Sequence, residues 1–357
     1  ATAEAAAAVA DRDNGDRLPL HWCARRDHAA AVAVLVRADA ATIDARDARR
    51  GATPLWHAFD ARASRTARLL LEVLHANGSI STNDGDTLLH FAARHQYSQL
   101  ATRLVQRGAA VGARDAAGLT PLHVAAAVGG DNVIEALVAA DGDAVRGAVG
   151  ERDAYGYTAA FYAALRNTRT GSRALSMLIG AGADVFQRVP LVPSDGGGAN
   201  GGSGTASSAT VQRELLENVF TEAQRDALNA ATCGWTLVHA AVHGVRDADD
   251  STHTLGALFI GALQVRTATL SDAAFALAAE PASCGSGDGD GGDKGGGSDA
   301  GAGAGVTPMH LAVRRGAVKA VRLLARMGAR TDVVDLSDTT VNDLLRDGAD
   351  PDGRLRD

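Results

Sequence analysis

The sequence predicts an all-α solenoid, in which helix-turn-helix units are joined by β-hairpin loops. Three observations lead to this prediction: a phrase that returns about every 33 residues, a helix start signal in each copy, and a composition rich in small apolar residues. The chain has 357 residues, of which 46% are hydrophobic but only 4% aromatic. Such a chain can bury a long core of Ala, Leu and Val. A solenoid builds this core one repeat at a time.

The repeated phrase is clearest in three copies, GDTLLHFAA at 85–93, GLTPLHVAA at 118–126 and GVTPMHLAV at 305–313. Four further copies are RLPLHWCA at 17–24, GATPLWHA at 51–58, GYTAAFYAA at 156–164 and GWTLVHAA at 234–241. A Thr stands at the same place in most copies, at 53, 87, 120, 158, 236, 307 and 340, and Leu18 replaces it in the first. Regular self-similarity of this kind is the signature of a repeat architecture.

Each copy contains the chemistry of a helix start. Thr followed by Pro provides an N-cap and a residue that is preorganised for the first helical turn. A second apolar pattern follows at helical spacing, for example at residues 132–140 and 317–327. Gly108, Gly182 and Gly328 come after second helices, where a left-handed residue ends a helix. Each unit is therefore expected to be a hairpin, a helix, a turn and a second helix.

This phrase and its period resemble the ankyrin repeat, and the resemblance covers most of the chain outside two glycine-rich stretches. It implies a protein-binding function without a catalytic site or a cofactor. It also implies that the His of the phrase braces the turn through hydrogen bonds, at His21, His90, His123, His239 and His310. Trp56 and Phe161 replace this His in two repeats. A bracing role tolerates these replacements, whereas a metal site would not.

The spacing divides the chain into segments. We expect a tail or the remnant of a helix at 1–12, five ankyrin-like repeats at 13–186 and a flexible linker at 187–210. An extra helix and the sixth repeat are expected at 211–283, and a Gly/Asp-rich flexible linker at 284–304. The seventh repeat and a C-terminal cap follow at 305–350, and a tail at 351–357. Long loops add little closure entropy, so one interrupted solenoid is favoured over separate domains.

Other chemistry has little support. The acidic run Asp288, Asp290, Asp293 and Asp299 lacks the Gly and Glu positions of a calcium loop, and its glycines lack the ending of a phosphate loop. Cys23, Cys233 and Cys284 are scattered, so neither a disulfide framework nor a thiolate metal site is expected. Cys233 has no recognisable His and acid partners that would make it a nucleophile. Cys23 is expected in the core.

The formal net charge of −7 gives no reason to expect a nucleic-acid partner. No run of about twenty apolar residues is present, so no membrane span is expected. Residues 1–10 lack the features of a secretory signal and the chain does not begin with Met, so we expect a fragment of an intracellular protein, cytoplasmic or nuclear. A monomer is expected.

Ankyrin proteins bind partners along a concave face, through hairpin tips and the ends of first helices. Transferred to this sequence, the resemblance assigns to the tips Arg17, Arg49, Arg50, Asp84, Asp86, Tyr155, Tyr157 and Trp235. It assigns to the helix ends Arg25, Arg26, Arg94, His95, Arg166, Arg314 and Arg315. Because Arg pairs with carboxylates and aromatic residues anchor interfaces, these positions favour a basic, aromatic groove for an acidic partner segment. Plain solvated positions are the alternative.

We therefore interpret the chain as a recognition module, adaptor or scaffold that binds proteins. One alternative is the substrate-recognition part of a larger enzyme or ubiquitin-ligase adaptor, whose effector domain lies outside this chain. Another is a structural spacer, which would have no partner.

Overall fold

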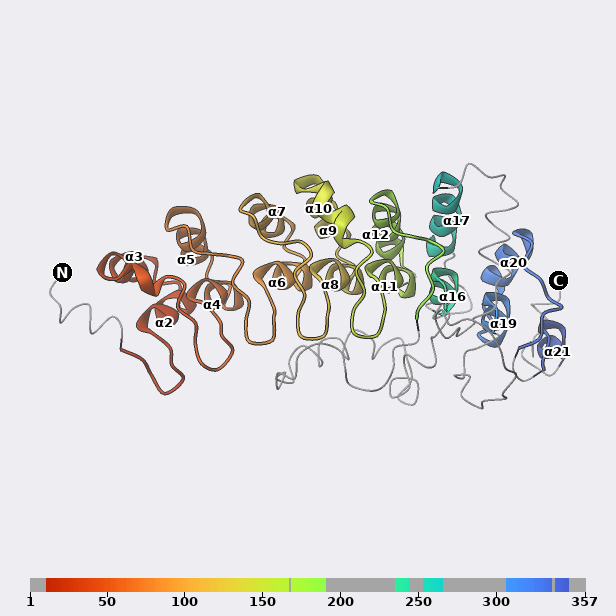
Figure 1. The fold of residues 1–357 in the computed structure, drawn as a ribbon, viewed down its shortest axis with the longest axis horizontal. Helices are drawn as coiled ribbons and strands as arrows, with labels where there is room; N and C mark the ends of the chain where they lie inside the picture. The colour runs from red at the N-terminus through yellow and green to blue at the C-terminus, as the bar shows by residue number, and fades with distance from the viewer. Residues whose placement is uncertain are drawn as a thin grey trace, which may run out of the picture.

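A computed structural model describes residues 11–166, 168–190, 235–243, 253–265, 306–335 and 338–346, with side chains of the fourth segment up to residue 260. The helices lie in two rows that run from α2 at one end to α21 at the other (Figure 1). One row holds the first helix of each repeat and the other holds the second. The connecting loops project to the same side of the first-helix row (Figure 1). This arrangement is a solenoid of helix pairs, as predicted.

The first helices of the seven repeats are α2 (Pro19–Arg25), α4 (Pro54–Asp60), α6 (Leu88–Arg94), α8 (Pro121–Val128), α11 (Ala159–Leu165), α16 (Leu237–His243) and α19 (Pro308–Arg314). The second helices are α3 (Ala29–Ala38), α5 (Ser64–Arg68) with the π turn η2 (Leu69–Val73), α7 (Ser98–Gln106), α9 (Asp131–Ala140), α12 (Arg169–Gly180), α17 (His253–Val265) and α20 (Val318–Arg326). Short helices are η1 (Ala40–Thr42), α10 (Gly142–Ala148) and the cap helix α21 (Val341–Arg346). The additional helix α10 accounts for the longer spacing between the fourth and fifth repeats.

The helix boundaries follow from the local sequence. The Thr53 hydroxyl accepts a hydrogen bond from the Trp56 N–H at 3.3 Å, and Pro54 begins α4. Gly108, Gly182 and Gly328 have φ values of 84°, 104° and 83° after second helices. The left-handed helix ends are therefore where the glycines predicted them.

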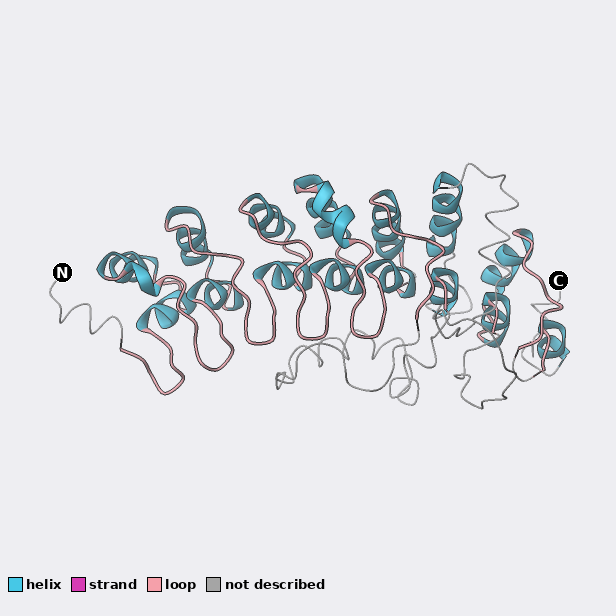
Figure 2. Cartoon of the chain, in the orientation of Figure 1, coloured by secondary structure: helices cyan, strands magenta, loops and turns pink. Residues whose placement is uncertain are grey.

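The connecting turns are narrow. In the described part of the chain the only bridge between extended residues joins Val334 and Thr340, and Figure 2 shows no strand there. One backbone hydrogen bond typically closes a turn, such as Asp115 N–H to Leu119 O at 3.0 Å. The expected β-hairpins are thus turns without a strand ladder, because the chain enters the next helix directly after this bond.

The stack continues from the fifth repeat to the seventh. Helix α11 packs against α16, α12 against α17, and α16 against α19. The Val189 N–H donates to Trp235 O at 2.9 Å, and His239 Nε2 donates to Val306 O at 2.9 Å. The predicted extra helix at 211–220, a second candidate at 271–279, and both glycine-rich stretches lie outside the described residues. The segment boundaries given above stay a prediction.

Candidate protein-interaction surface

Buried histidines connect five of the repeats to the turn that follows. His123 Nδ1 accepts from the Thr120 N–H at 3.1 Å, while its Nε2 donates to Tyr157 O in the following turn at 3.0 Å. The same pattern joins His21 to Ala45, His90 to Leu119, His239 to Val306 and His310 to Thr339. Burial lowers the pKa of both His123 and His239 to about 4, so both rings are neutral at pH 7. The predicted bracing role is confirmed.

A second set of braces consists of turn aspartates that the sequence reasoning missed. Asp153 Oδ1 accepts from the N–H groups of Tyr155 and Tyr157, and its Oδ2 accepts from the Tyr162 hydroxyl at 2.6 Å. The same bond to the backbone of the turn recurs at Asp13, Asp47, Asp115 and Asp335. Most of these aspartates precede the Thr slot by five residues, and this spacing was the signal that could have revealed them. They hold the turns at a fixed angle to the first helices.

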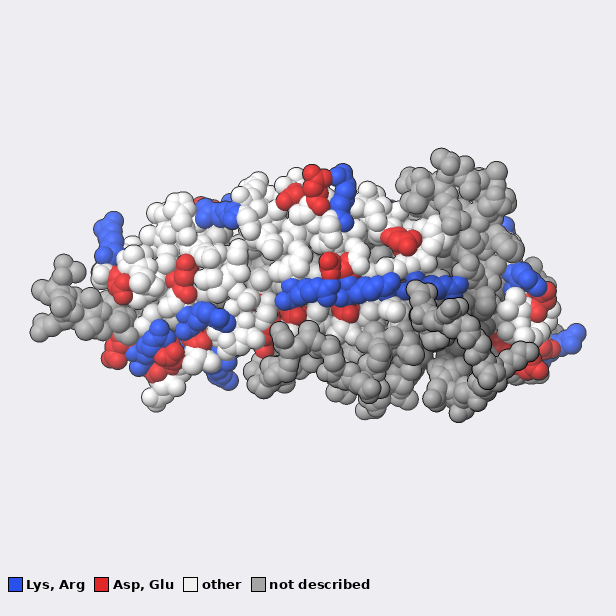
Figure 3. All heavy atoms as spheres, in the orientation of Figure 1, with Lys and Arg blue, Asp and Glu red and all other residues white. Residues whose placement is uncertain are grey.

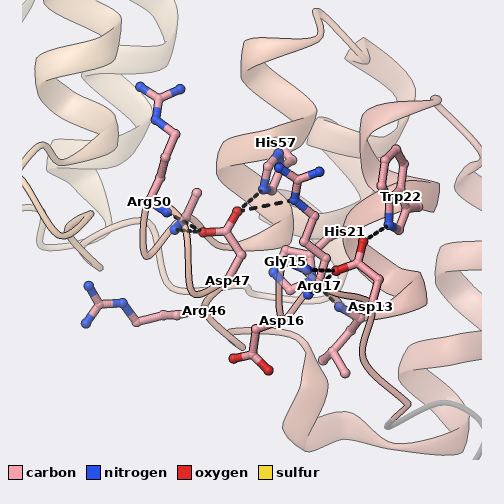
Figure 4. A network of polar contacts seen from close by, with 12 residues as sticks. Asp13, Gly15, Asp16, Arg17, His21, Trp22, Arg46, Asp47, Arg50 and His57 are labelled. Carbon is pink, nitrogen blue, oxygen red and sulfur yellow. Dashed lines mark hydrogen bonds and ion pairs between the residues drawn. The ribbon is translucent and has the colours of Figure 1, made fainter. Parts of the chain in front are cut away.

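Figure 4 shows the brace between the first two repeats. Asp47 Oδ2 accepts from His57 Nε2 at 3.0 Å and lies 3.6 Å from Arg17 Nε. Burial raises the pKa of Asp47, but hydrogen bonds from the N–H groups of Arg50 and Ala52 outweigh it and leave the pKa below its usual 3.8. Burial lowers the pKa of His57 despite the nearby carboxylate, so a neutral imidazole donates to a charged Asp47. The Arg50 side chain points away from this network (Figure 4).

Most of the predicted contact residues are exposed. This set contains Arg25, Arg26, Arg49, Arg50, His95, Tyr155, Arg314 and Arg315. Two aromatic predictions are wrong, because Tyr157 is 0% exposed and Trp235 is 6% exposed. Tyr157 stacks on Phe161 with ring centroids 4.5 Å apart, and Trp235 stacks on His239 at 6.0 Å. Both belong to the core between repeats and cannot anchor a partner.

Several predicted arginines also bond within the chain. Arg94 pairs with buried Asp86 at 3.3 Å, and Arg166 donates to Ala127 O at 2.9 Å. Arg17 approaches Asp47, Arg314 pairs with Asp335, and Arg315 Nη2 lies 2.6 Å from His243 Nδ1. Asp84 is buried like Asp86, so neither is an exposed tip residue as expected. Charge reversal at Arg94 or Arg166 would therefore perturb the scaffold as well as any partner contact.

Two exposed features escaped the sequence reasoning. Trp22 is 38% exposed, its Nε1 donates to Asp13 Oδ2 at 3.0 Å, and the Arg17 guanidinium lies 5.3 Å from its ring centroid. A row of arginines also runs along the turns. Arg114 and Arg152 directly precede turn aspartates, Arg114 donates to Arg152 O, and Arg152 donates to Arg188 O. Figure 3 shows basic side chains forming a band across the middle repeats on the face in view. Arg114, Arg152 and Arg188 are 36 to 38 residues apart, and this spacing was the sequence signal for the row.

Other site types receive no support from the described residues. Within these segments no group of three or more His, Cys, Asp and Glu side chains could hold a metal ion. None of the described helices combines the length and apolar character that a membrane crossing needs. Cys23 packs against the core but is only partly buried, and burial raises its thiol pKa. Cys233, Cys284 and the acidic run at 288–299 lie outside the described residues.

Sequence comparisons agree with this geometry. A family model of ankyrin repeats in three copies matches residues 20–115 and 89–188, and a model of a single ankyrin repeat matches residues 304–336. The chain belongs to the ankyrin-repeat family. One similar protein is the "Probable 26S proteasome regulatory subunit p28" of Saccharomyces cerevisiae, 29% identical over 154 residues. That match covers 43% of this chain and 66% of the yeast protein, just under two thirds of its length. Ankyrin repeats are protein-interaction modules without catalytic machinery of their own.

Proposed function

We propose that this ankyrin-repeat chain binds partner proteins on its concave face, through a tip-and-end surface of exposed turn tips and first-helix ends. This surface comprises Trp22, Arg25, Arg26, Arg49, Arg50, His95, Tyr155, Arg314 and Arg315. One observation carries the proposal: hydrogen bonds fix the backbone of the turns, while side chains at the turn tips stay exposed. The His and Asp braces hold the backbone of each turn, so the tip side chains need little further ordering when a partner binds.

The chemistry of this surface favours an acidic partner segment. Arg26, Arg49 and Arg50 are exposed arginines on a chain whose formal charge is −7. Arginine binds carboxylates bidentately, and Trp and Arg are common energetic anchors of interfaces. Trp22 and Tyr155, 38% and 37% exposed, provide aromatic contact area beside the cations.

Affinity purification from extracts of the source cells, followed by mass spectrometry, tests this proposal. The R25E/R26E variant should lose the specific partner, because both side chains are exposed at the end of α2. The matched control R37E/R322E changes the net charge equally on exposed positions of second helices, and it should retain the partner. If both variants recover the same proteins as the native chain, the tip-and-end surface is not the binding site. If the native chain itself recovers no specific protein, the result favours a structural spacer.

A second candidate is a recognition subunit of a proteolytic assembly or a ubiquitin-ligase adaptor. The similarity to the yeast protein, a probable proteasome regulatory subunit, favours it. This role predicts that the native chain recovers proteasome or ubiquitin-ligase subunits in the same experiment and that the R25E/R26E variant does not.

A further inference from the structure

The second repeat departs from the other repeats in its first helix. Trp56 occupies the slot of the bracing His, so the bond from that His to the following turn is missing between repeats two and three. Phe59, six residues after Thr53, occupies a slot that holds Ala in four repeats and Val in two, namely Ala24, Ala93, Ala126, Ala164, Val242 and Val313. The Trp56 and Phe91 rings meet at 5.6 Å across this boundary. Bulky rings thus lie where small side chains let other repeats pack closely.

The second helix of the same repeat contains one extra residue. The left-handed residue His75 follows Thr53 by 22 positions, whereas Gly108 follows Thr87 by 21. The π turn Leu69–Val73 absorbs this residue, and the Leu74 N–H bonds to Leu69 O at 2.9 Å. Single π turns inside helices frequently lie at functional sites.

A groove lies between repeats two and three, and both Phe59 and Leu71 of the π turn line it. It has a volume of about 510 Å³, and apolar side chains form its floor, from Phe59, Ala63, Ala67, Leu71 and Leu100. A hollow of about 320 Å³ adjoins it and shares Leu71. This size lies within the usual range of ligand-binding pockets. Its lining comes from the end of α4, from α5 and from the start of α7, with the helix-helix turns at Arg62 and Gln96, and it includes no hairpin tip.

Loss of the bracing His does not by itself create such a groove. In the fifth repeat Phe161 replaces this His, but Tyr157 stacks on it and fills the space. The hollow beside Phe161 measures only about 10 Å³. At the second repeat no such compensation is present, and the buried Trp56 Nε1 has no hydrogen-bond partner within the described residues.

The rim of the groove is basic. Its lining includes Arg62, Arg68 and Arg103 but no acidic residue, and a single carboxylate, Glu72, pairs with Arg103 and lies 3.9 Å from Arg68. The side chains of Arg68 and Arg103 are 74% and 50% exposed, so both can reach a bound segment.

The boundary between repeats one and two has an acidic side chain near the start of its second helix, and the rim of the groove has none. Between repeats one and two, Asp27 Oδ1 accepts from the Thr66 N–H at 2.8 Å, near the start of α5. The equivalent slot in repeat two is Arg62, and no side chain caps the start of α7. An arginine therefore stands beside the positive end of a helix at the groove, at the slot where repeat one has an aspartate.

We propose that the groove binds a short segment of a partner protein that carries a large apolar side chain flanked by acidic residues. The apolar side chain packs on Phe59 and Leu71, and the carboxylates pair with Arg62 and Arg68. The groove lining contains none of the tip-and-end residues, although His95 of that surface stacks on the lining residue Tyr97 at 5.8 Å. A partner can therefore occupy both.

A random peptide library displayed on phage tests the proposal. The library is selected on the intact chain and counter-selected on Q99W, which places an indole over the groove from an exposed position of α7. Enriched peptides are synthesised with a fluorescent label, and their affinities are measured by fluorescence anisotropy. We expect an apolar residue flanked by Asp or Glu in these peptides. Binding should be about tenfold weaker to R62E/R68E, since two attractions become two repulsions.

Two variants serve as matched controls. R322E/R326E reverses two charges on the exposed side of α20 and should bind the peptides like the native chain. R25E/R26E alters the tip-and-end surface and should also bind them normally, which separates this proposal from the proposed function. The proposal is overturned if no peptide depends on the groove, if the peptides lack the acidic and apolar pattern, or if R62E/R68E binds as tightly as R322E/R326E.

Discussion

Acidification from pH 7.5 to pH 5.0 should destabilise the solenoid through its buried histidines. Burial lowers the pKa of His123 and His239 to about 4 and that of His243 to about 3. The charges that face these rings add to this effect, because Arg114 and His90 act on His123, Arg188 on His239 and Arg315 on His243. Protonation would also place an N–H at His123 Nδ1, directly against the Thr120 N–H that it now accepts.

The magnitude follows from linkage. An unfolded His titrates near 6.5, so between pH 6.5 and about 4 the unfolded chain binds more protons than the folded chain, and stability falls as the pH falls. At pH 5.0 each of the three histidines costs about 2 kcal/mol of unfolding free energy relative to pH 7.5. The sum, about 6 kcal/mol, is a large fraction of the stability of an ordinary domain.

Urea unfolding followed by circular dichroism at pH 7.5, 6.5 and 5.0 measures this loss. Most of the decrease in the urea midpoint should lie below pH 6.5. Nitrogen NMR of the imidazole rings is the direct control, since His123 should stay neutral, with its proton on Nε2, at pH 5.0. Titration of His123 near 6.5, or a midpoint that does not change between pH 7.5 and 5.0, would refute the reasoning.

Three further predictions concern single side chains. H123A should cost roughly 3 kcal/mol or more of unfolding free energy in urea denaturation, because it empties a buried site, leaves the Thr120 N–H without its ring acceptor and removes one of the two hydrogen bonds to Tyr157 O; the exposed H28A is the control and should cost almost nothing. Y162F should cost about 1.5 to 3 kcal/mol in the same assay, since it removes the 2.6 Å hydrogen bond to the Asp153 carboxylate; no loss would mean that the turn does not need this brace. F59A should cost less than about 2 kcal/mol, well under the usual penalty for Phe in a core, because Ala fits this slot in four other repeats. If the Phe59 ring keeps repeats two and three from packing closely, F59A should also increase hydrogen-exchange protection at the start of α7. A loss of 3 to 5 kcal/mol would show instead that Phe59 is an ordinary core residue.

The repeat scaffold could be predicted from sequence because its signals are local. Thr at the N-cap, Pro at the first helical position and Gly in the left-handed conformation each act within a few residues. Their recurrence at a fixed period then indicates stacking. The role of the bracing His followed from the resemblance, and the structure shows its bond to Tyr157 O for His123.

Which site residues are exposed could not be predicted from a single repeat, because it depends on comparing the repeats and on their packing. The residue directly before the Thr slot is buried in each described repeat from two to seven, and it is apolar at Ala52, Leu119 and Val306. Comparison along this slot would have placed Tyr157 and Trp235 in the core. The partners of Arg94 and Arg166 could not be predicted, since long side chains reach several acceptors and only packing selects one.

The position of the irregularities is itself informative. A repeat protein is stabilised by its internal units and by the contacts between neighbours, so a poorly packed boundary lowers stability without any local benefit. Replacement of the His at Phe161 is compensated by a stacked Tyr157. The boundary after the second repeat combines Trp56, Phe59 and an extra residue in the second helix, and no side chain fills the resulting groove. The meeting of these three features at one boundary, with arginines on its rim, supports the proposal that the scaffold gives up packing there to bind another molecule.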